Sequence, residues 1–158
     1  MTELPAAAKR VEAAARALGL EIEIRTMPAS TRTAAEAAAA VGASVGQIVK
    51  SLVFKGETTG KALLILVSGP NRVSEPAMTG ILGEPIVRPD ADFVRSATGF
   101  AIGGVPPLGH AAPLATFMDE DLMQYETIWA AAGTPYTVFA VSPTALQAAA
   151  AATIIRVK

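Results

Sequence analysis

The sequence predicts a single mixed α/β domain, spanning residues 1–158, in which the sheet is mostly antiparallel. Its length of 158 residues is ordinary for one domain. Short β-branched or leucine-rich stretches alternate with alanine-rich stretches typical of helices. Tight turns rich in Gly and Pro join most neighbouring strands, which favours antiparallel pairing. We therefore expect one sheet or an open barrel of about seven strands with flanking helices.

The first elements are predicted to be a helix and a strand. Residues 2–18 carry an apolar stripe at helical spacing, with Thr2 as the cap and Gly19 as the end. Residues 21–25 alternate charged and apolar side chains, which predicts a half-buried strand.

A second helix and a hairpin are expected next. Thr33 and Glu36 have the spacing of a capping box, and Gly42 ends the alanine-rich helix that they open. The apolar runs 48–54 and 61–68 are separated by a Gly-bounded polar turn, which predicts a β-hairpin.

The rest of the chain is predicted from caps, proline positions and β-branched runs. In order, we expect a helix from Ser74 to Gly80 or Gly83, a strand over 85–88, a helix over 90–97, strands over 100–105 and 114–118, an acidic turn or helix start over 119–122, a hairpin of 127–132 and 136–141, a helix from Ser142, and a strand over 153–157.

Composition excludes several kinds of chemistry. With no cysteine and one histidine, the chain has no thiol nucleophile and no recognisable zinc cluster, so we expect no metal and no cofactor. There is no phosphate-binding P-loop, no dinucleotide fingerprint and no Gly-x-Ser-x-Gly elbow. A net charge of −1 argues against tight nucleic-acid binding by charge alone. Without a signal peptide or a long apolar run, we expect a cytoplasmic protein that contacts neither membrane nor DNA.

The segment 103–110 contains three glycines, two prolines and the only histidine. It could be a plain rigid turn, or a set of backbone N–H groups that stabilises an oxyanion. His110 is either a general base or a loop residue that makes a local hydrogen bond.

Lys50 lies inside the predicted strand 48–54, on the same face as Leu52 and Phe54. A lysine on an apolar face either extends to water or finds an oxygen partner in a pocket. Ser51 lies on the opposite face, as a small strand residue or, with a kink, as a hydroxyl at the site. Asp119, in an acidic run after a strand, either begins a solvated helix or holds an amino group in the pocket.

Three segments together resemble the YbaK family, which comprises the editing domain inserted in bacterial prolyl-tRNA synthetases and its free-standing relatives. They are Gly46–Phe54, Leu64–Gly69 and Gly103–His110, and the likeness extends from about Glu21 to Val157. A lysine followed by a hydroxyl or amide residue, combined with a Gly-x-x-Pro-x-Gly loop, is the more specific part of the pattern.

The resemblance implies hydrolysis of the ester that joins a wrongly attached amino acid to the 3′-terminal adenosine of tRNA. In the family, water or a substrate hydroxyl attacks and no protein nucleophile is used. The family's essential lysine corresponds to Lys50, the residue that shapes substrate choice to Ser51, and a nearby acidic residue to Asp119. His110 is not a general family feature. The corresponding loop residues are Gly104, Pro107 and Gly109, with Gly103 beside them.

We therefore expect a free-standing trans-editing aminoacyl-tRNA deacylase acting on tRNA-Pro that carries a small non-cognate amino acid. Met27, Ser51 and Leu52 would form the pocket wall. Expected partners are the 3′ acceptor end of the aminoacyl-tRNA and, transiently, prolyl-tRNA synthetase. The alternatives are a non-catalytic module that binds aminoacyl-adenosine or an amino acid and regulates a synthetase, and a hydrolase of an unrelated small ester or amide.

Overall fold

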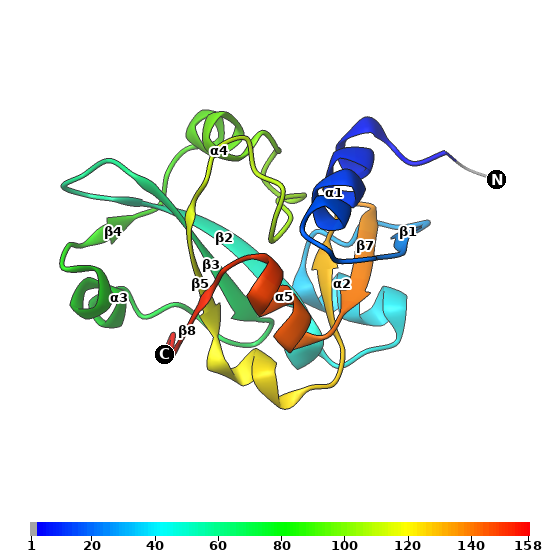
Figure 1. Cartoon of the computed structure of the whole chain (residues 1–158). Helices are drawn as coiled ribbons and strands as arrows, with labels where there is room; N and C mark the ends of the chain where they lie inside the picture. The colour runs from blue at the N-terminus through cyan, green and yellow to red at the C-terminus, as the bar shows by residue number, and fades with distance from the viewer. Residues whose placement is uncertain (1–2) are drawn as a thin grey trace.

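The computed structural model describes residues 3–158 and has the predicted mixed α/β fold, with its strands divided between two sheets (Figure 1). The larger sheet has the strand order β4-β2-β3-β5-β8, and the smaller has the order β1-β7-β6. Thr2, the predicted cap of the first helix, lies outside the described residues.

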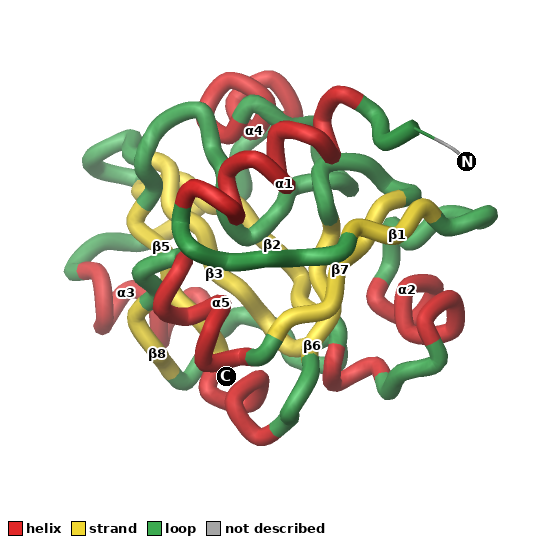
Figure 2. Tube along the Cα trace, turned by 45° about the vertical axis from the view of Figure 1, so that its right-hand side comes forward, coloured by secondary structure: helices red, strands yellow, loops and turns green. Residues whose placement is uncertain are grey.

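The helices lie around the sheets (Figure 2). The α-helices are α1 (Ala6–Ala17), α2 (Ala34–Val41), α3 (Glu75–Leu82), α4 (Ala91–Thr98) and α5 (Pro143–Ala149), and the 3₁₀ helices are η1 (Val45–Gln47) and η2 (Glu120–Gln124). The strands are β1 (Ile24–Thr26), β2 (Val49–Gly56), β3 (Ala62–Ser68), β4 (Ile86–Val87), β5 (Ala115–Asp119), β6 (Ile128–Ala131), β7 (Thr137–Val141) and β8 (Thr153–Ile155).

Within the described residues, four of the six strand pairings are antiparallel, and only β3–β5 and β5–β8 are parallel. Both predicted hairpins are confirmed, β2–β3 and β6–β7. An isolated parallel bridge between Ile48 and Trp129 connects the start of β2 to the smaller sheet. The two sheets therefore meet at one end of β2 and separate along it.

The hairpin β2–β3 contributes to apolar clusters on both faces of the larger sheet. Val49, with Leu64 and Leu66 of β3, belongs to the cluster that includes Val105. Phe54 belongs to the other cluster, which also includes Met78 of α3. This alternation places Lys50 on the Phe54 face, as the sequence predicted.

Local capping signals explain where several helices begin and end. Thr33 and Glu36 form the predicted capping box of α2, and Gly42 ends that helix with φ of 72°. Ser74 and Ser142 accept hydrogen bonds from the first turns of α3 and α5. These contacts are local in sequence, and for this reason the sequence predicts them well.

The predicted strand over 100–105 is wrong. Gly104 N donates to Ala101 O at 3.1 Å, and Gly103 has φ of +94°, so the segment turns instead of extending. Phe100 and Val105 are buried on either side of this turn. Their apolar character therefore reflects burial without strand pairing.

The predicted strand over 21–25 is shorter and shifted. Pairing with β7 covers only Ile24–Thr26. Leu20 and Ile22 pack against the core without belonging to a strand. The alternation of side chains correctly indicated burial on one side of the segment, but burial does not require a neighbouring strand.

Candidate functional site

A cavity of about 570 Å³ lies along β2. Every residue from Val49 to Phe54 lines it, so the cavity reaches both faces of the strand and therefore runs along its edge. The opposite walls come from α2, β6, and the segments before α4 and after it. Its lining includes Arg32, Lys50, Ser51, Leu52, Arg88, Gly103 and Trp129.

The edge of β2 is open here because its neighbours cover only its two ends. On this side, β4 pairs only with Lys55 and Gly56. At the other end, β6 meets the chain only through the bridge at Ile48. Between these contacts the backbone of β2 faces the cavity.

The register shows which backbone groups are free. Gly56 N donates to Lys61 O at 2.9 Å, so Gly56 is hydrogen-bonded to the β3 side. Because hydrogen-bonded positions alternate along an antiparallel pair, Lys50 also directs its N–H and C=O toward β3. Ser51 and Val53 therefore direct theirs into the cavity.

Lys50 is half-buried, and its Nζ donates to the backbone oxygen of Asn71 at 2.5 Å. Burial lowers the pKa of Lys50 below its ordinary value, with a further contribution from the positive charge of Arg72, while Asp119 partly opposes the shift. The ammonium is thus fixed beside the cavity, where it can bind a carbonyl or phosphate oxygen.

A buried carboxylate holds the Lys50 partner in place. Asp119 is 1% exposed, and its oxygens accept from Ser68 N at 3.0 Å, Asn71 Nδ2 at 2.9 Å and Asp121 N at 2.9 Å. Asn71 Nδ2 also donates to Asp121 Oδ2 at 2.7 Å. Asn71 therefore links Asp119 to Lys50, using its amide toward one and its backbone oxygen toward the other.

The glycine loop has different neighbours at each glycine. Gly103, with φ of +94°, lines the cavity, and a Cβ there would lie 3.0 Å from Arg32 Nε. Gly109, with φ of +83°, packs against α1, where a Cβ would lie 2.9 Å from the Cβ of Ala14. Pro107 is buried and does not line the cavity.

Gly104 lies against the turn between β6 and β7. We expect Gly104→Ala to destabilise the fold by about 1–3 kcal/mol, because small-to-large changes in packed sites force backbone shifts. The new Cβ would lie 2.7 Å from Thr134 Cα and 2.8 Å from Gly133 O. Urea denaturation measures the effect, and Gly80→Ala in α3, where no atom lies within 4 Å of the new Cβ, is the matched control. Equal stability of the two variants would contradict the close packing.

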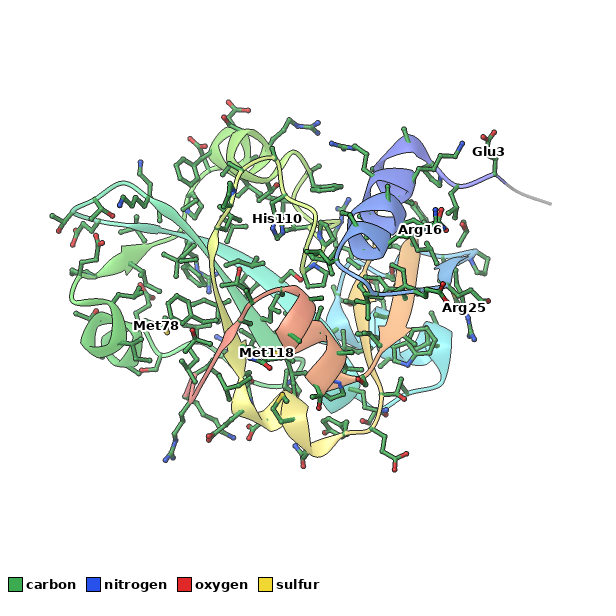
Figure 3. The ribbon with its side chains drawn as sticks, viewed as in Figure 1. Glu3, Arg16, Arg25, Met78, His110 and Met118 are labelled. Atoms are coloured by element: carbon green, nitrogen blue, oxygen red, sulfur yellow. The ribbon has the colours of Figure 1, made fainter. Side chains whose placement is uncertain are left out.

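His110 makes the local hydrogen bond that one of the two interpretations anticipated. Its Nε2 lies 2.8 Å from Pro106 O, and burial lowers its pKa, an effect that this hydrogen bond partly opposes. Figure 3 shows His110 in the loop that follows α4 and leads to β5. It does not line the cavity.

The ten predicted site residues thus fall into two groups. Those that line the cavity are Lys50, Ser51, Leu52 and Gly103. Those that do not are Met27, Gly104, Pro107, Gly109, His110 and Asp119. Of the second group, Asp119 still contacts the site indirectly, because it accepts a hydrogen bond from Asn71 Nδ2. Met27 is half-buried, and its N–H donates to Tyr136 O.

A family model described as the aminoacyl-tRNA editing domain matches residues 28–149. The chain belongs to the aminoacyl-tRNA editing domain family. The match includes β2, the loop after α4 and the Asn71–Asp119 network, so every part of the site described above lies within the editing domain.

The chain is similar to known proteins in sequence and in fold. YwhH of Bacillus subtilis, whose function is uncharacterised, is 28% identical over 127 residues, which are 80% of each chain. A crystal structure of a proposed trans-editing enzyme for prolyl-tRNA synthetase is 49% identical, with a TM-score of 0.93 over 99% of both chains. The structure of the hypothetical protein APE2540 is 30% identical, with a TM-score of 0.87, covering 94% of this chain and 98% of that one.

The charge at the cavity of the editing domain is positive. Arg32 and Arg88 join Lys50 in its lining, and no acidic side chain among residues 3–158 lines it. The sequence analysis did not identify Arg32, Asn71 or Trp129 as site residues. Nothing local in the sequence distinguishes these residues from ordinary surface or turn positions.

Two further findings concern the described residues only. No group of three or more His, Asp or Glu side chains is arranged to hold a metal ion within residues 3–158. No helix in this part of the chain is both long and apolar enough to span a bilayer.

Proposed function

We propose that the chain is a free-standing, cytoplasmic trans-editing deacylase that hydrolyses the ester of mischarged aminoacyl-tRNA. The observation that carries the proposal is the cavity of this editing-domain chain, where an ordered lysine ammonium, a glycine turn and free backbone N–H groups line one space. A cavity of about 570 Å³ is large enough for an aminoacyl group together with its terminal nucleoside, because pockets of about 300–1,000 Å³ hold drug-sized ligands.

In the proposed reaction, a water molecule adds to the ester carbonyl carbon. The bond from that carbon to the ribose oxygen breaks, and the ribose oxygen receives a proton, which yields free amino acid and uncharged tRNA. Lys50 binds the carbonyl oxygen or the terminal phosphate, and backbone N–H groups stabilise the oxyanion. The ribose 2′-hydroxyl or a substrate group assists the water, because among residues 3–158 no His, Asp or Glu lines the cavity to activate the Ser51 hydroxyl as a nucleophile.

We further propose that the preferred substrate is tRNA-Pro carrying a small amino acid. Ala130 and Ala131 line the same cavity as Ser51, and such small side chains in the wall suit a small amino acid. The acceptor stem or a transient complex with prolyl-tRNA synthetase would supply tRNA identity. The positive lining formed by Lys50, Arg32 and Arg88 suits the terminal phosphates.

A deacylation screen tests the function. The protein is incubated with tRNA-Pro and with other tRNAs, each charged with alanine, cysteine, serine, threonine or 2-aminobutyrate. Prolyl-tRNA-Pro is the cognate control. We expect at least one small non-cognate ester to be hydrolysed faster than in buffer and faster than the prolyl ester. If no ester is accelerated but an aminoacyl-adenosine analogue binds, the chain is the alternative, a non-catalytic binding module.

The lowered pKa of Lys50 predicts how the rate of deacylation changes at alkaline pH. An ammonium that holds an oxygen loses this ability when it is deprotonated, so activity is expected to fall as pH rises through the pKa of Lys50. Because that pKa is below the ordinary 10.5, the fall should begin at lower pH than for an exposed lysine. The measurement is kcat/KM against pH after subtraction of spontaneous ester hydrolysis. A profile that is flat up to 10.5 would contradict this role.

A further inference from the structure

The open edge of β2 at Ser51 is a binding feature that the proposed mechanism does not use fully. The N–H and C=O of Ser51 point into the cavity, and Ser51 lies between the strand contacts made by Ile48 and by Lys55. Backbone polar groups that are removed from water when a ligand fills the cavity require hydrogen-bond partners. Ser51 Oγ is also buried, with no partner among the described residues.

We propose that this edge binds the amino-acid part of the substrate through the main chain, as one residue of an additional antiparallel strand. The inference rests on the proposed function and names the ligand class that the site selects, which is an L-α-aminoacyl ester. The α-ammonium donates to Ser51 O, and the ester carbonyl accepts from Ser51 N–H.

The match follows from strand geometry. In a hydrogen-bonded antiparallel pair, the two residues directly opposite each other exchange both backbone hydrogen bonds. An α-aminoacyl group has a donor nitrogen and a carbonyl on either side of one Cα, as a strand residue does. Ser51 presents the complementary acceptor and donor at the free edge. An acyl group without an α-donor satisfies only one of the two groups.

The same strand geometry selects the chirality of the amino acid. Directly paired residues in a sheet direct their side chains to the same face. An L-aminoacyl side chain opposite Ser51 would therefore lie on the Ser51 face, toward Val105, where the buried Ser51 Oγ has no partner. A D-aminoacyl side chain would project toward the opposite face, which carries Lys50.

A series of esters tests whether the α-ammonium of the substrate donates to Ser51 O. The same tRNA is esterified with L-alanine, lactic acid, propionic acid or D-alanine, and each enzymatic rate is divided by the spontaneous hydrolysis rate of that ester. We expect the acceleration to fall from alanyl to lactyl, and by about tenfold or more from alanyl to propionyl, because hydrogen bonds to charged groups are strong. We expect D-alanyl to be accelerated less than L-alanyl. Equal acceleration for alanyl and propionyl esters, or for the two enantiomers, would overturn the proposal.

A binding measurement separates this inference from the proposed function. 3′-Deoxy-3′-(L-alanylamino)adenosine, which cannot undergo ester hydrolysis, is titrated into ¹⁵N-labelled protein. We expect the amide resonance of Ser51 to shift downfield, and the shift to be lost with the 3′-propionylamino analogue. If no ester is hydrolysed, the proposed function fails, yet this shift still reports the binding mode. If L-alanyl esters are hydrolysed while the Ser51 amide does not respond, only the edge proposal fails.

Discussion

Replacing Lys50 with alanine is expected to lower the rate of deacylation by about 10²–10³-fold, the usual loss when one preorganised oxyanion donor is removed. The ammonium lies at the cavity and is held by Asn71 O at 2.5 Å. Alanine removes the positive charge but leaves the free edge of β2 and the loop after α4 in place. Single-turnover hydrolysis of the best ester from the screen measures the effect.

Lys55→Ala is the matched control for this change. Lys55 lies on the same strand, but its Nζ lies over the ring of Phe93, 5.1 Å from the centroid, and the residue does not line the cavity. Its replacement should leave the rate within about twofold, because the Lys55 charge lies outside the cavity lining. Lys50→Arg keeps the charge with a different shape, and we expect it to recover only part of the activity. If Lys50→Ala and Lys55→Ala retain the same rate, Lys50 has no role in the reaction.

Much of the fold could be predicted because its signals are local. The capping box at Thr33, the Ser74 cap and both hairpins depend on residues only a few positions apart. The segment 100–105 could not be resolved in this way. Phe100 and Val105 are buried by distant elements, and the turn at Gly103 breaks the extended backbone that the composition suggested.

In the site, too, the features that depend on local sequence could be predicted, and those that depend on tertiary structure could not. Strand alternation correctly placed Lys50 on the Phe54 face, because that depends on the strand alone. The role of Asn71 depends on its backbone oxygen meeting a side chain 21 positions earlier, which no residue type signals. Likewise, the open edge at Ser51 exists because β4 is short and β6 diverges, and both are properties of the tertiary structure.

Asp119→Ala is expected to produce the largest loss of stability, about 3–5 kcal/mol, because a buried carboxylate is removed from a fully bonded network. The change leaves Ser68 N and Asn71 Nδ2 without their shared acceptor and removes the acceptor of Asp121 N. Urea denaturation monitored by the single tryptophan measures the free energy of unfolding.

Asp121→Ala is the control that distinguishes the effect of the buried Asp119 carboxylate from that of its neighbour Asp121. The Asp121 side chain is 31% exposed and pairs with Lys158 at 3.1 Å, so its loss should destabilise the fold much less than the loss of Asp119. Both variants remove one acceptor from Asn71, but only Asp119→Ala also frees the end of β3 at Ser68. A similar loss of stability in the two variants would mean that Asp119 does not anchor the network. A larger loss of stability for Asp119→Ala, together with slower deacylation by the folded fraction, would indicate that Asp119 positions Lys50 through Asn71.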